Sequence, residues 1–341
     1  MKKLLFVVFA ALASSAFATN YYVDAVSGND SWDGTRPIES ANGLSGPRRT
    51  LVAAMALTQV GDTVYAAEGT YDQGGEKYDT HSCSNRVVIL PGRRLVASGR
   101  RELTVIKGQG AGANKNANGT DAIRCVFLVG KTADAPGGVI KGFTITGGYT
   151  MTGAVGADTC GGGVGGPLIG SDFDKNGLAV DCDIYDNAAG QYGPNVVSST
   201  LLRCRVGNAV SGDYEFFRNT LAIDSFYFGN KKLYWHVKLI NCTHTGSLEA
   251  YGNSSKNFWS YNCLFTNPSY NIHNLSQFFC TYFRVAQKAG PSYDGNCRFE
   301  LTGEDLKMSK LDPARPLPGS VVAEQGNLTY YYAATDRKSV V

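Results

Sequence analysis

Apolar residues in this chain occur in short runs that glycine, asparagine and aspartate interrupt. Such runs predict short β-strands, which we expect at 21–23, 64–67, 87–90, 103–107, 125–129 and 139–146. A different pattern follows Thr50, where the compact apolar run 51–57 predicts a short helix with Thr50 as its N-cap. The chain is therefore expected to be mostly β structure, with a short helix near its beginning.

A repeat is visible in the second half of the chain. Its frame recurs every 17 to 22 residues, at Cys182, Cys204, Ser225, Cys242, Cys263, Cys280 and Cys297. One strand per repeat at this spacing is typical of the coils of a parallel β-solenoid. Because strand residues two apart share a face, the repeated position and the residue two further on are expected to point inward. The latter residues are Ile184, Val206, Tyr227, His244, Phe265, Tyr282 and Phe299.

The nine cysteines allow two interpretations. Stacked at one inward position, they can remain free thiols that pack as small hydrophobic side chains. Alternatively, neighbouring coils, such as those of Cys182 and Cys204, lie at a spacing that a disulfide can bridge. No Cys-x-x-Cys pair occurs, and the cysteines do not cluster with histidines, so a structural zinc site is not expected.

Several motifs resemble those of a known superfamily. The segments 22–30 (YVDAVSGND), 61–65 (GDTVY) and 68–71 (EGTY) resemble the opening of right-handed parallel β-helix proteins of the pectin-lyase-like superfamily. The segments 140–148 (IKGFTITGG) and 161–164 (GGGV) are similar to the first coils of secreted bacterial β-helix repeat proteins of the polymorphic outer-membrane-like passenger type. The resemblance implies an all-β, right-handed parallel β-helix with a short N-terminal capping helix, and it is specific for the fold rather than for an activity.

Both ends are expected to lie outside the folded domain. Residues 1–18 combine two lysines, a short apolar run and an Ala-x-Ala site, which predicts a signal peptide and a secreted or cell-surface protein. Residues 336–341 (DRKSVV) match the translation of a common sequencing adapter, so we interpret them as an artefact. The remaining residues, 19–335, are then one β-helix domain truncated at its C-terminus, with any native C-terminal anchor lost.

Composition narrows the classes of function. With 43% hydrophobic and 18% charged residues, the chain can bury a large core. Its formal net charge of +3 comes from the two ends, so a nucleic-acid partner is not expected. No apolar run is long enough to predict a transmembrane helix.

The resemblance also implies a possible chemistry. Lyases of this superfamily cleave acidic polysaccharide by β-elimination, in which calcium bound to carboxylates neutralises the uronate and an arginine or lysine removes a proton. The candidate bases are Arg203, Arg205, Lys231 and Lys238. The candidate calcium ligands are Asp172, Asp174, Asp181 and Asp183, of which the first two begin a run with D-x-D-x-N-G spacing.

A structural interpretation competes with this chemistry. The residues before the repeated position, from Asp181 and Arg203 to Asp224, Asn241 and Asn262, are expected to stack along the outside of the coils. Opposite charges on adjacent strands stabilise each other, and a paired arginine holds its proton more tightly. Candidate sugar-stacking side chains are Tyr234, Trp235 and Trp259. We therefore expect a surface or secreted passenger that binds glycans or cell surfaces, with a polysaccharide lyase or other carbohydrate-active enzyme as the alternative.

Overall fold

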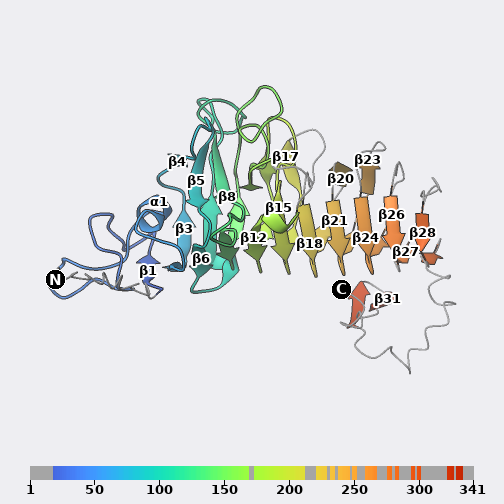
Figure 1. Ribbon diagram of the computed structural model, residues 1–341, viewed down its shortest axis with the longest axis horizontal. Helices are drawn as coiled ribbons and strands as arrows, with labels where there is room; N and C mark the ends of the chain where they lie inside the picture. Colours follow the sequence, from blue (N-terminus) through green and yellow to red (C-terminus); the bar gives the residue numbers. More distant parts are fainter. Residues whose placement is uncertain are drawn as a thin grey trace, which may run out of the picture.

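The chain folds into a long stack of coils whose strands form two sheets along its length (Figure 1). The computed structural model describes residues 18–168, 173–211, 220–228, 231–234, 237–245, 248–251, 258–266, 275–278, 281–283, 293–295, 298–300, 321–325 and 328–332.

The first long sheet, sheet A, contains eleven parallel strands. In spatial order they are β1 (Asn20–Val23), β2 (Thr63–Ala66), β6 (Arg94–Ala97), β9 (Val139–Lys141), β12 (Gly177–Val180), β15 (Ser199–Leu202), β18 (Thr220–Ile223), β21 (Val237–Ile240), β24 (Phe258–Tyr261), β26 (Leu275–Phe278) and β28 (Tyr293–Gly295).

The second long sheet, sheet B, contains ten parallel strands. They are β3 (Gly69–Tyr71), β7 (Thr104–Lys107), β10 (Thr144–Thr146), β13 (Asp183–Ile184), β16 (Arg205–Val206), β19 (Phe226–Phe228), β22 (Thr243–Thr245), β25 (Leu264–Thr266), β27 (Thr281–Phe283) and β29 (Arg298–Glu300). Each coil from β2 onward passes through sheet A and then sheet B, which confirms the predicted right-handed parallel β-helix.

A third sheet, sheet C, closes the early coils. It consists of β4 (Glu76–Lys77), β5 (Ser84–Ile89), β8 (Ile123–Leu128) and β11 (Val164–Gly165), with β4 antiparallel to β5. Smaller pairs are β14 (Asn187–Ala188) with β17 (Ala209–Ser211), β20 (Lys231–Tyr234) with β23 (Leu248–Tyr251), and the antiparallel β30 (Val321–Gln325) with β31 (Leu328–Tyr332). Two single-turn 3-10 helices are η1 (Arg101–Leu103) and η2 (Phe173–Lys175).

The predicted capping helix is α1 (Leu51–Met55). The Thr50 side chain accepts a hydrogen bond from the backbone N–H of Ala53 at 3.2 Å, as an N-cap does. Leu51, Ala54 and Met55 are buried and join the main core, so the helix covers the first coil at the N-terminal end of the stack (Figure 1).

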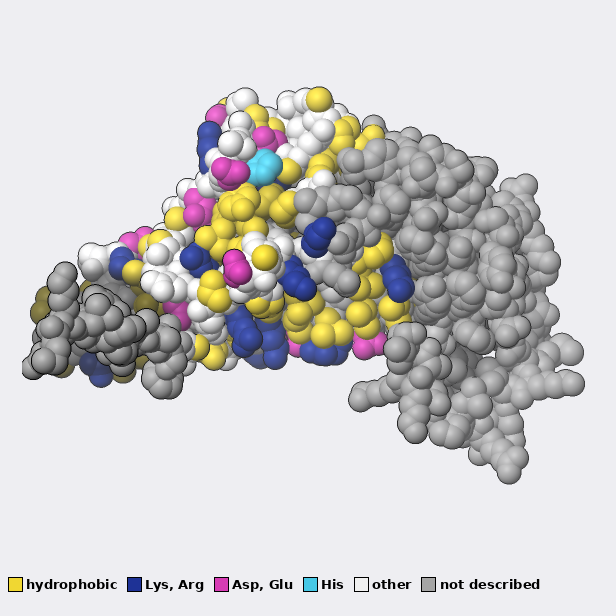
Figure 2. Space-filling view, in the orientation of Figure 1, with side chains coloured by type: hydrophobic (Ala, Val, Ile, Leu, Met, Phe, Trp, Pro, Cys, Tyr) yellow, Lys and Arg dark blue, Asp and Glu magenta, His cyan; other side chains and the backbone are white. Residues whose placement is uncertain are grey.

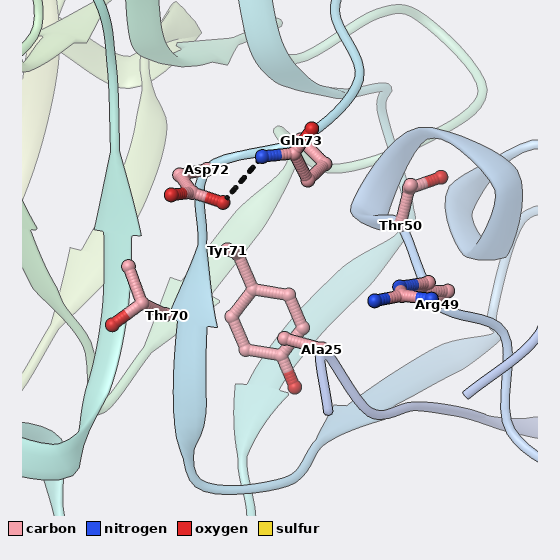
Figure 3. Close-up of a pocket in the computed structure, with 7 residues that line it drawn as sticks. All are labelled: Ala25, Arg49, Thr50, Thr70, Tyr71, Asp72 and Gln73. Atoms are coloured by element: carbon pink, nitrogen blue, oxygen red, sulfur yellow. Dashed lines mark hydrogen bonds between the residues drawn. The ribbon is translucent and has the colours of Figure 1, made fainter. Parts of the chain in front are cut away.

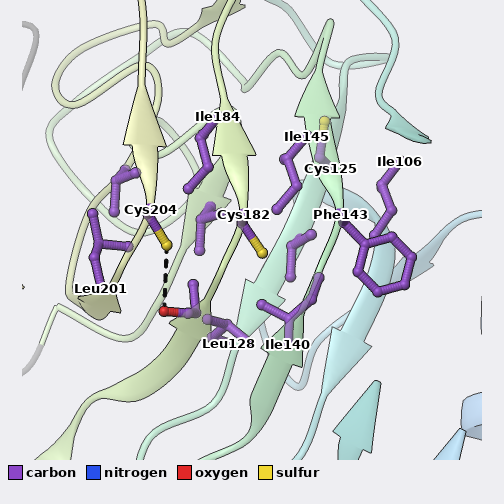
Figure 4. Close-up of a cluster of buried hydrophobic side chains, with 14 of the residues drawn as sticks. Ile106, Cys125, Leu128, Ile140, Phe143, Ile145, Cys182, Ile184, Leu201 and Cys204 are labelled. Carbon is purple, nitrogen blue, oxygen red and sulfur yellow. Dashed lines mark hydrogen bonds between the residues drawn. The ribbon is translucent and has the colours of Figure 1, made fainter. Parts of the chain in front are cut away.

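The inward ladder is confirmed wherever the structure describes its side chains. Cys182, Cys204, Cys242 and Cys263 are each at most 3% exposed, and Ser225 occupies the same position between them. The residues two further on, from Ile184 to His244, are also buried. Figure 4 shows Ile184 in the core beside Cys182 and Cys204. Seven described cysteines are free thiols, namely Cys83, Cys125, Cys160, Cys182, Cys204, Cys242 and Cys263. Residues Cys280 and Cys297, and the side chains of Phe265, Tyr282 and Phe299, lie outside the described part of the structure.

The prediction of one strand per coil was too low. From β2 onward, a coil contributes one strand to sheet A and one to sheet B, with a corner between them. The predicted strand 139–146 breaks at Gly142, where φ is +81°, into β9 and β10. In later coils the residue before the ladder position has a φ between +49° and +53°, at Asp181, Arg203, Asp224, Asn241 and Asn262. Glycine, asparagine and aspartate tolerate this left-handed conformation, which explains their recurrence there.

Coil length differs between the two halves of the molecule. From β12 onward, register partners such as Gly177 and Ser199, or Thr220 and Val237, are 22 or 17 residues apart, as predicted. Earlier coils are longer, and Leu95 pairs with a residue 45 positions on. Their extra residues form the loops 72–83, 108–122 and 147–163, which we call the loop cluster and which follow strands of sheet B.

A buried arginine anchors the loop cluster. The Arg124 side chain, on β8, is 1% exposed and donates to the backbone oxygens of Gly161 at 2.7 Å and Cys160 at 2.8 Å. It also donates to the Asn85 side chain at 2.8 Å and to the backbone oxygen of Ala157. Its charge is therefore solvated by neutral oxygens, three from the loop that precedes β11 and one from Asn85 on β5.

Candidate functional site

The outward residues at the corner between sheets A and B form a ladder across successive coils. Arg203 donates to both carboxylate oxygens of Asp181, at 2.8 and 3.0 Å. Further along, the Asn241 amide donates to Asp224 and the Asn262 amide to Asn241, each at 3.1 Å. The predicted stack of alternating charges and asparagines is thus confirmed. Figure 2 shows Lys and Arg gathered with Asp and Glu along the lower margin of the molecule, where the strands of sheet A end in Figure 1.

A denser cluster of charges lies beside this ladder, around Asp183 on β13. Arg205 donates through Nε and Nη2 to the Asp183 carboxylate, with the Nε distance at 2.7 Å. Arg101 Nε lies 3.4 Å from the same carboxylate, and Glu102 lies 3.4 Å from Arg101 and 3.9 Å from Arg205. The Asp183 side chain is consequently only 5% exposed although it projects from the outer face.

Arg101 belongs to η1, two coils before Asp183. The coil between them contributes Gly142 and Thr144, which are small at the corresponding corner and strand positions. The Arg101 side chain can therefore reach across that coil. The sequence did not reveal this contact, because the two residues are distant in the chain and belong to no common motif.

The ion pairs shift the pKa values of their members. The hydrogen bond from Arg203 lowers the pKa of Asp181, and the same bond raises the pKa of Arg203. The hydrogen bond to Asp183 likewise raises the pKa of Arg205. Both guanidiniums therefore stay protonated at neutral pH, which suits them to hold an anion and not to remove a proton.

Aromatic side chains continue the outer face of sheet B beside the charges. Phe226, the register partner of Arg205, is 38% exposed. The Phe228 ring lies 6.2 Å from the Phe226 ring and covers Gly207, where a Cβ atom would come within 2.3 Å of it. We call Arg205, Gly207, Phe226 and Phe228, together with Tyr185, the sheet B platform. Sequence reasoning placed no sugar-stacking residue here.

Of the other predicted site residues, Lys238 alone has its side chain described. Lys238 lies half-buried on β21 in sheet A. Lys231 and Tyr234 lie on β20 and Trp259 on β24, and their side chains fall outside the described part, as do residues Asp172 and Trp235. Asp174 belongs to η2, with its side chain likewise outside. The predicted roles of these seven residues stay predictions.

The predicted calcium site does not fit the two candidates whose side chains are described. The carboxylates of Asp181 and Asp183 already accept hydrogen bonds from Arg203 and Arg205, whose positive charges oppose a cation there. Across the described residues, no group of three or more His, Cys, Asp or Glu side chains is placed to hold a metal ion.

A separate pocket of about 380 Å³ lies at the N-terminal end of sheet B (Figure 3). It is lined by Ala25, Arg49, Thr50, Thr70, Tyr71, Asp72 and Gln73. Sequence reasoning did not select these residues. Three of them come from residues 24–50, between β1 and α1, which we call the capping segment, and four come from the first strand of sheet B and the turn after it.

No family model and no curated protein match the chain. Among solved structures, it is similar to a rhamnogalacturonan lyase (14% identity, 84% of this chain and 88% of that chain, TM-score 0.41) and a pectate lyase (14%, 84% and 80%, 0.44). A pectin methylesterase from carrot is similar at 12% identity, over 86% of this chain and 92% of that chain, with a TM-score of 0.35. At such identities and TM-scores, the similarity does not indicate which residues act or on what.

The strand order and register define the class: this chain has a right-handed parallel β-helix fold. The fold confirms the architecture that the sequence motifs resemble. In the described part of the chain, no helix is long and apolar enough to cross a membrane.

Proposed function

We propose that this chain is an exported protein that acts on carbohydrate by binding acidic polysaccharide along the outer face of sheet B, without cleaving it. The observation that carries the proposal is that the exposed Phe226 is the register partner of Arg205 on the neighbouring strand of sheet B. Secretion or display at the cell surface belongs to the proposal and is supported by the signal-like residues 1–18.

An aromatic ring and a guanidinium recognise different parts of one sugar acid. The ring packs against the apolar C–H face of a pyranose, and the guanidinium donates charge-assisted hydrogen bonds to its carboxylate. Arg205 uses Nε and Nη2 for Asp183, and within the described structure Nη1 has no protein acceptor. A uronate lying on Phe226 can therefore accept from Nη1 while the pair with Asp183 stays intact.

The sheet suits an extended polymer. Neighbouring strands are about 4.8 Å apart, so successive outward positions form a straight row along the helix axis. Arg203 and Arg101 lie within the same surface, each paired with a carboxylate. A linear polyanion lying across the strands meets these groups in sequence, and its affinity should fall as salt screens them.

Binding is favoured over lyase chemistry because the described candidate bases are the wrong kind of group. β-Elimination needs a base that is unprotonated near neutral pH, whereas the pKa values of Arg203 and Arg205 are raised by their carboxylate partners. The carboxylates of Asp181 and Asp183 in turn accept hydrogen bonds from these arginines, which opposes the binding of a cation there.

The test uses the chain from residue 19 in affinity electrophoresis with pectate, alginate and chondroitin. We expect retardation by at least one polymer and about tenfold weaker binding in Phe226→Ala, since an aromatic contact contributes about 1–1.5 kcal/mol. Tyr65→Ala, which removes a partly buried tyrosine on sheet A, is the matched control. Equal binding by the two variants would contradict the proposed role of Phe226 in the sheet B platform. Ultraviolet-absorbing unsaturated products, with or without calcium, would show a lyase and refute the proposal.

A further inference from the structure

Sheet B begins one coil later than sheet A, which leaves a strand position vacant at the N-terminal end. Sheet A starts with β1, paired to β2, whereas the first strand of sheet B is β3. After β1 the chain bends away, because the Asp24 carboxylate accepts from the backbone N–H groups of Val26 at 2.8 Å and Ser27 at 3.1 Å. The edge of β3 that faces away from β7 is therefore unpaired in the described structure.

The pocket occupies this vacant position (Figure 3), and its walls are fixed by hydrogen bonds. On the cap side, Asp30 accepts from the backbone N–H groups of Arg49 and Thr50, both at 2.8 Å, and from the Thr50 hydroxyl at 2.9 Å. On the floor, the Tyr71 hydroxyl lies 2.8 Å from the backbone oxygen of Ala67. The pocket is thus formed before any ligand arrives, which lowers the entropic cost of binding.

The polar groups around the pocket suit a sugar acid. The Arg49 side chain is exposed, and its guanidinium has no hydrogen-bond or ion-pair partner among the described residues. Across the pocket, Asp72 accepts from the Gln73 amide at 2.9 Å and has a second carboxylate oxygen to spare. Thr70 adds a hydroxyl. One free cation for a carboxylate, with acceptors and donors for hydroxyls, is the complement of a uronate.

The pocket and the sheet B platform share one row of outward residues. By register, that row runs through Thr70, Val105, Thr144, Asp183, Arg205 and Phe226. At about 4.8 Å per strand, the row spans about 24 Å from the pocket to the exposed phenylalanine. The capping segment that contains Ala25, Arg49 and Thr50 closes the row at its N-terminal end.

From this arrangement we infer that the pocket binds the terminal uronate of a polysaccharide whose chain lies along sheet B, with Arg49 holding the carboxylate. The inference rests on the proposed function for the path of the chain, but the pocket is a site of its own. Because the capping segment blocks the row beyond the pocket, the structure favours a chain end over the middle of a polymer.

The test is calorimetric and NMR titration of the full-length chain with a single sugar acid, galacturonate, and with neutral galactose as the comparison ligand. We expect galacturonate to bind more tightly than galactose, and Arg49→Gln to weaken it at least about tenfold, the size of one charge-assisted hydrogen bond. Arg36→Gln, at an exposed arginine outside the pocket lining, is the matched control and should bind as the wild type does.

Each outcome separates the pocket from the platform. Loss of galacturonate binding in Arg49→Gln alone supports the pocket. Two results would overturn the pocket without affecting the sheet B platform. One is wild-type protein that binds polymer but not galacturonate, and the other is Arg49→Gln that binds galacturonate as tightly as the wild type. If galacturonate binds through Arg49 while polymers do not bind at all, the chain-end assignment is overturned together with the proposed function.

Discussion

Replacing Arg124 by methionine tests how the loop cluster is held to the coils. The substitution keeps a long side chain but removes four hydrogen bonds, to the backbone oxygens of Ala157, Cys160 and Gly161 and to the Asn85 side chain. Hydrogen bonds from a charged donor contribute about 1.5–3 kcal/mol each. The substitution also removes the desolvation cost of a buried guanidinium, which has no carboxylate partner in these contacts, and this offsets part of the lost stability. We expect a net loss of about 2–4 kcal/mol.

Urea unfolding measures the loss, and limited proteolysis locates it. Because three of the four acceptors lie in the loop 147–163, that loop should become the first site of cleavage in Arg124→Met. Gly165→Ala should act similarly, since a Cβ atom there would lie 2.7 Å from Arg124 Nε. Arg36→Met, at an exposed position, should stay within about 0.5 kcal/mol of the wild type. An unchanged urea midpoint together with unchanged cleavage in Arg124→Met would refute the reasoning.

Three further predictions concern the corner and the inward ladder. The hydrogen bond from Arg203 lowers the pKa of Asp181, so its stabilising effect should be present above about pH 4 and lost as the pH falls through the lowered pKa. Asp181→Asn should therefore reduce Tm at pH 6, and by progressively less as the pH is lowered below about 4. Asn241→Val should cost about 1–2 kcal/mol in chemical denaturation, because φ is +53°, and Asn241→Gly should cost less. Thiol titration of the unfolded, unreduced protein should return at least seven free thiols, and a lower number would mean that neighbours such as Cys182 and Cys204 are bridged.

The parts of the fold that the sequence predicted are those set by short-range rules. The cysteine frame and the alternation of strand residues were sufficient to place Cys204 and Val206 inside the coil. The corner ladder followed from the same frame, so the pairing of Arg203 with Asp181 was predictable without coordinates. The helix at Leu51–Met55 was predictable from its N-cap and its compact apolar run.

The strands of sheet A and the site were harder to predict, because they depend on three-dimensional arrangement. A single residue in the left-handed conformation, such as Gly142, divides what looks like one apolar strand into two. The contact between Arg101 and Asp183 requires a small coil between them, which no local pattern records. The repeat frame places Arg205 and Phe226 at equivalent positions of successive coils, but it does not indicate that the Phe226 side chain is 38% exposed there.

Between β9 and β25 the corner between the two long sheets always spans two residues, whereas the path back to sheet A varies widely in length. Because coil-to-coil hydrogen bonding depends on the strands, the returning path is free to change in length without shifting the register. The segment 108–122, for example, should accept a foreign peptide of similar length while the strands on either side stay paired. The molecule can therefore serve as a display scaffold, in which the paired strands preserve the fold and the returning loops can be replaced.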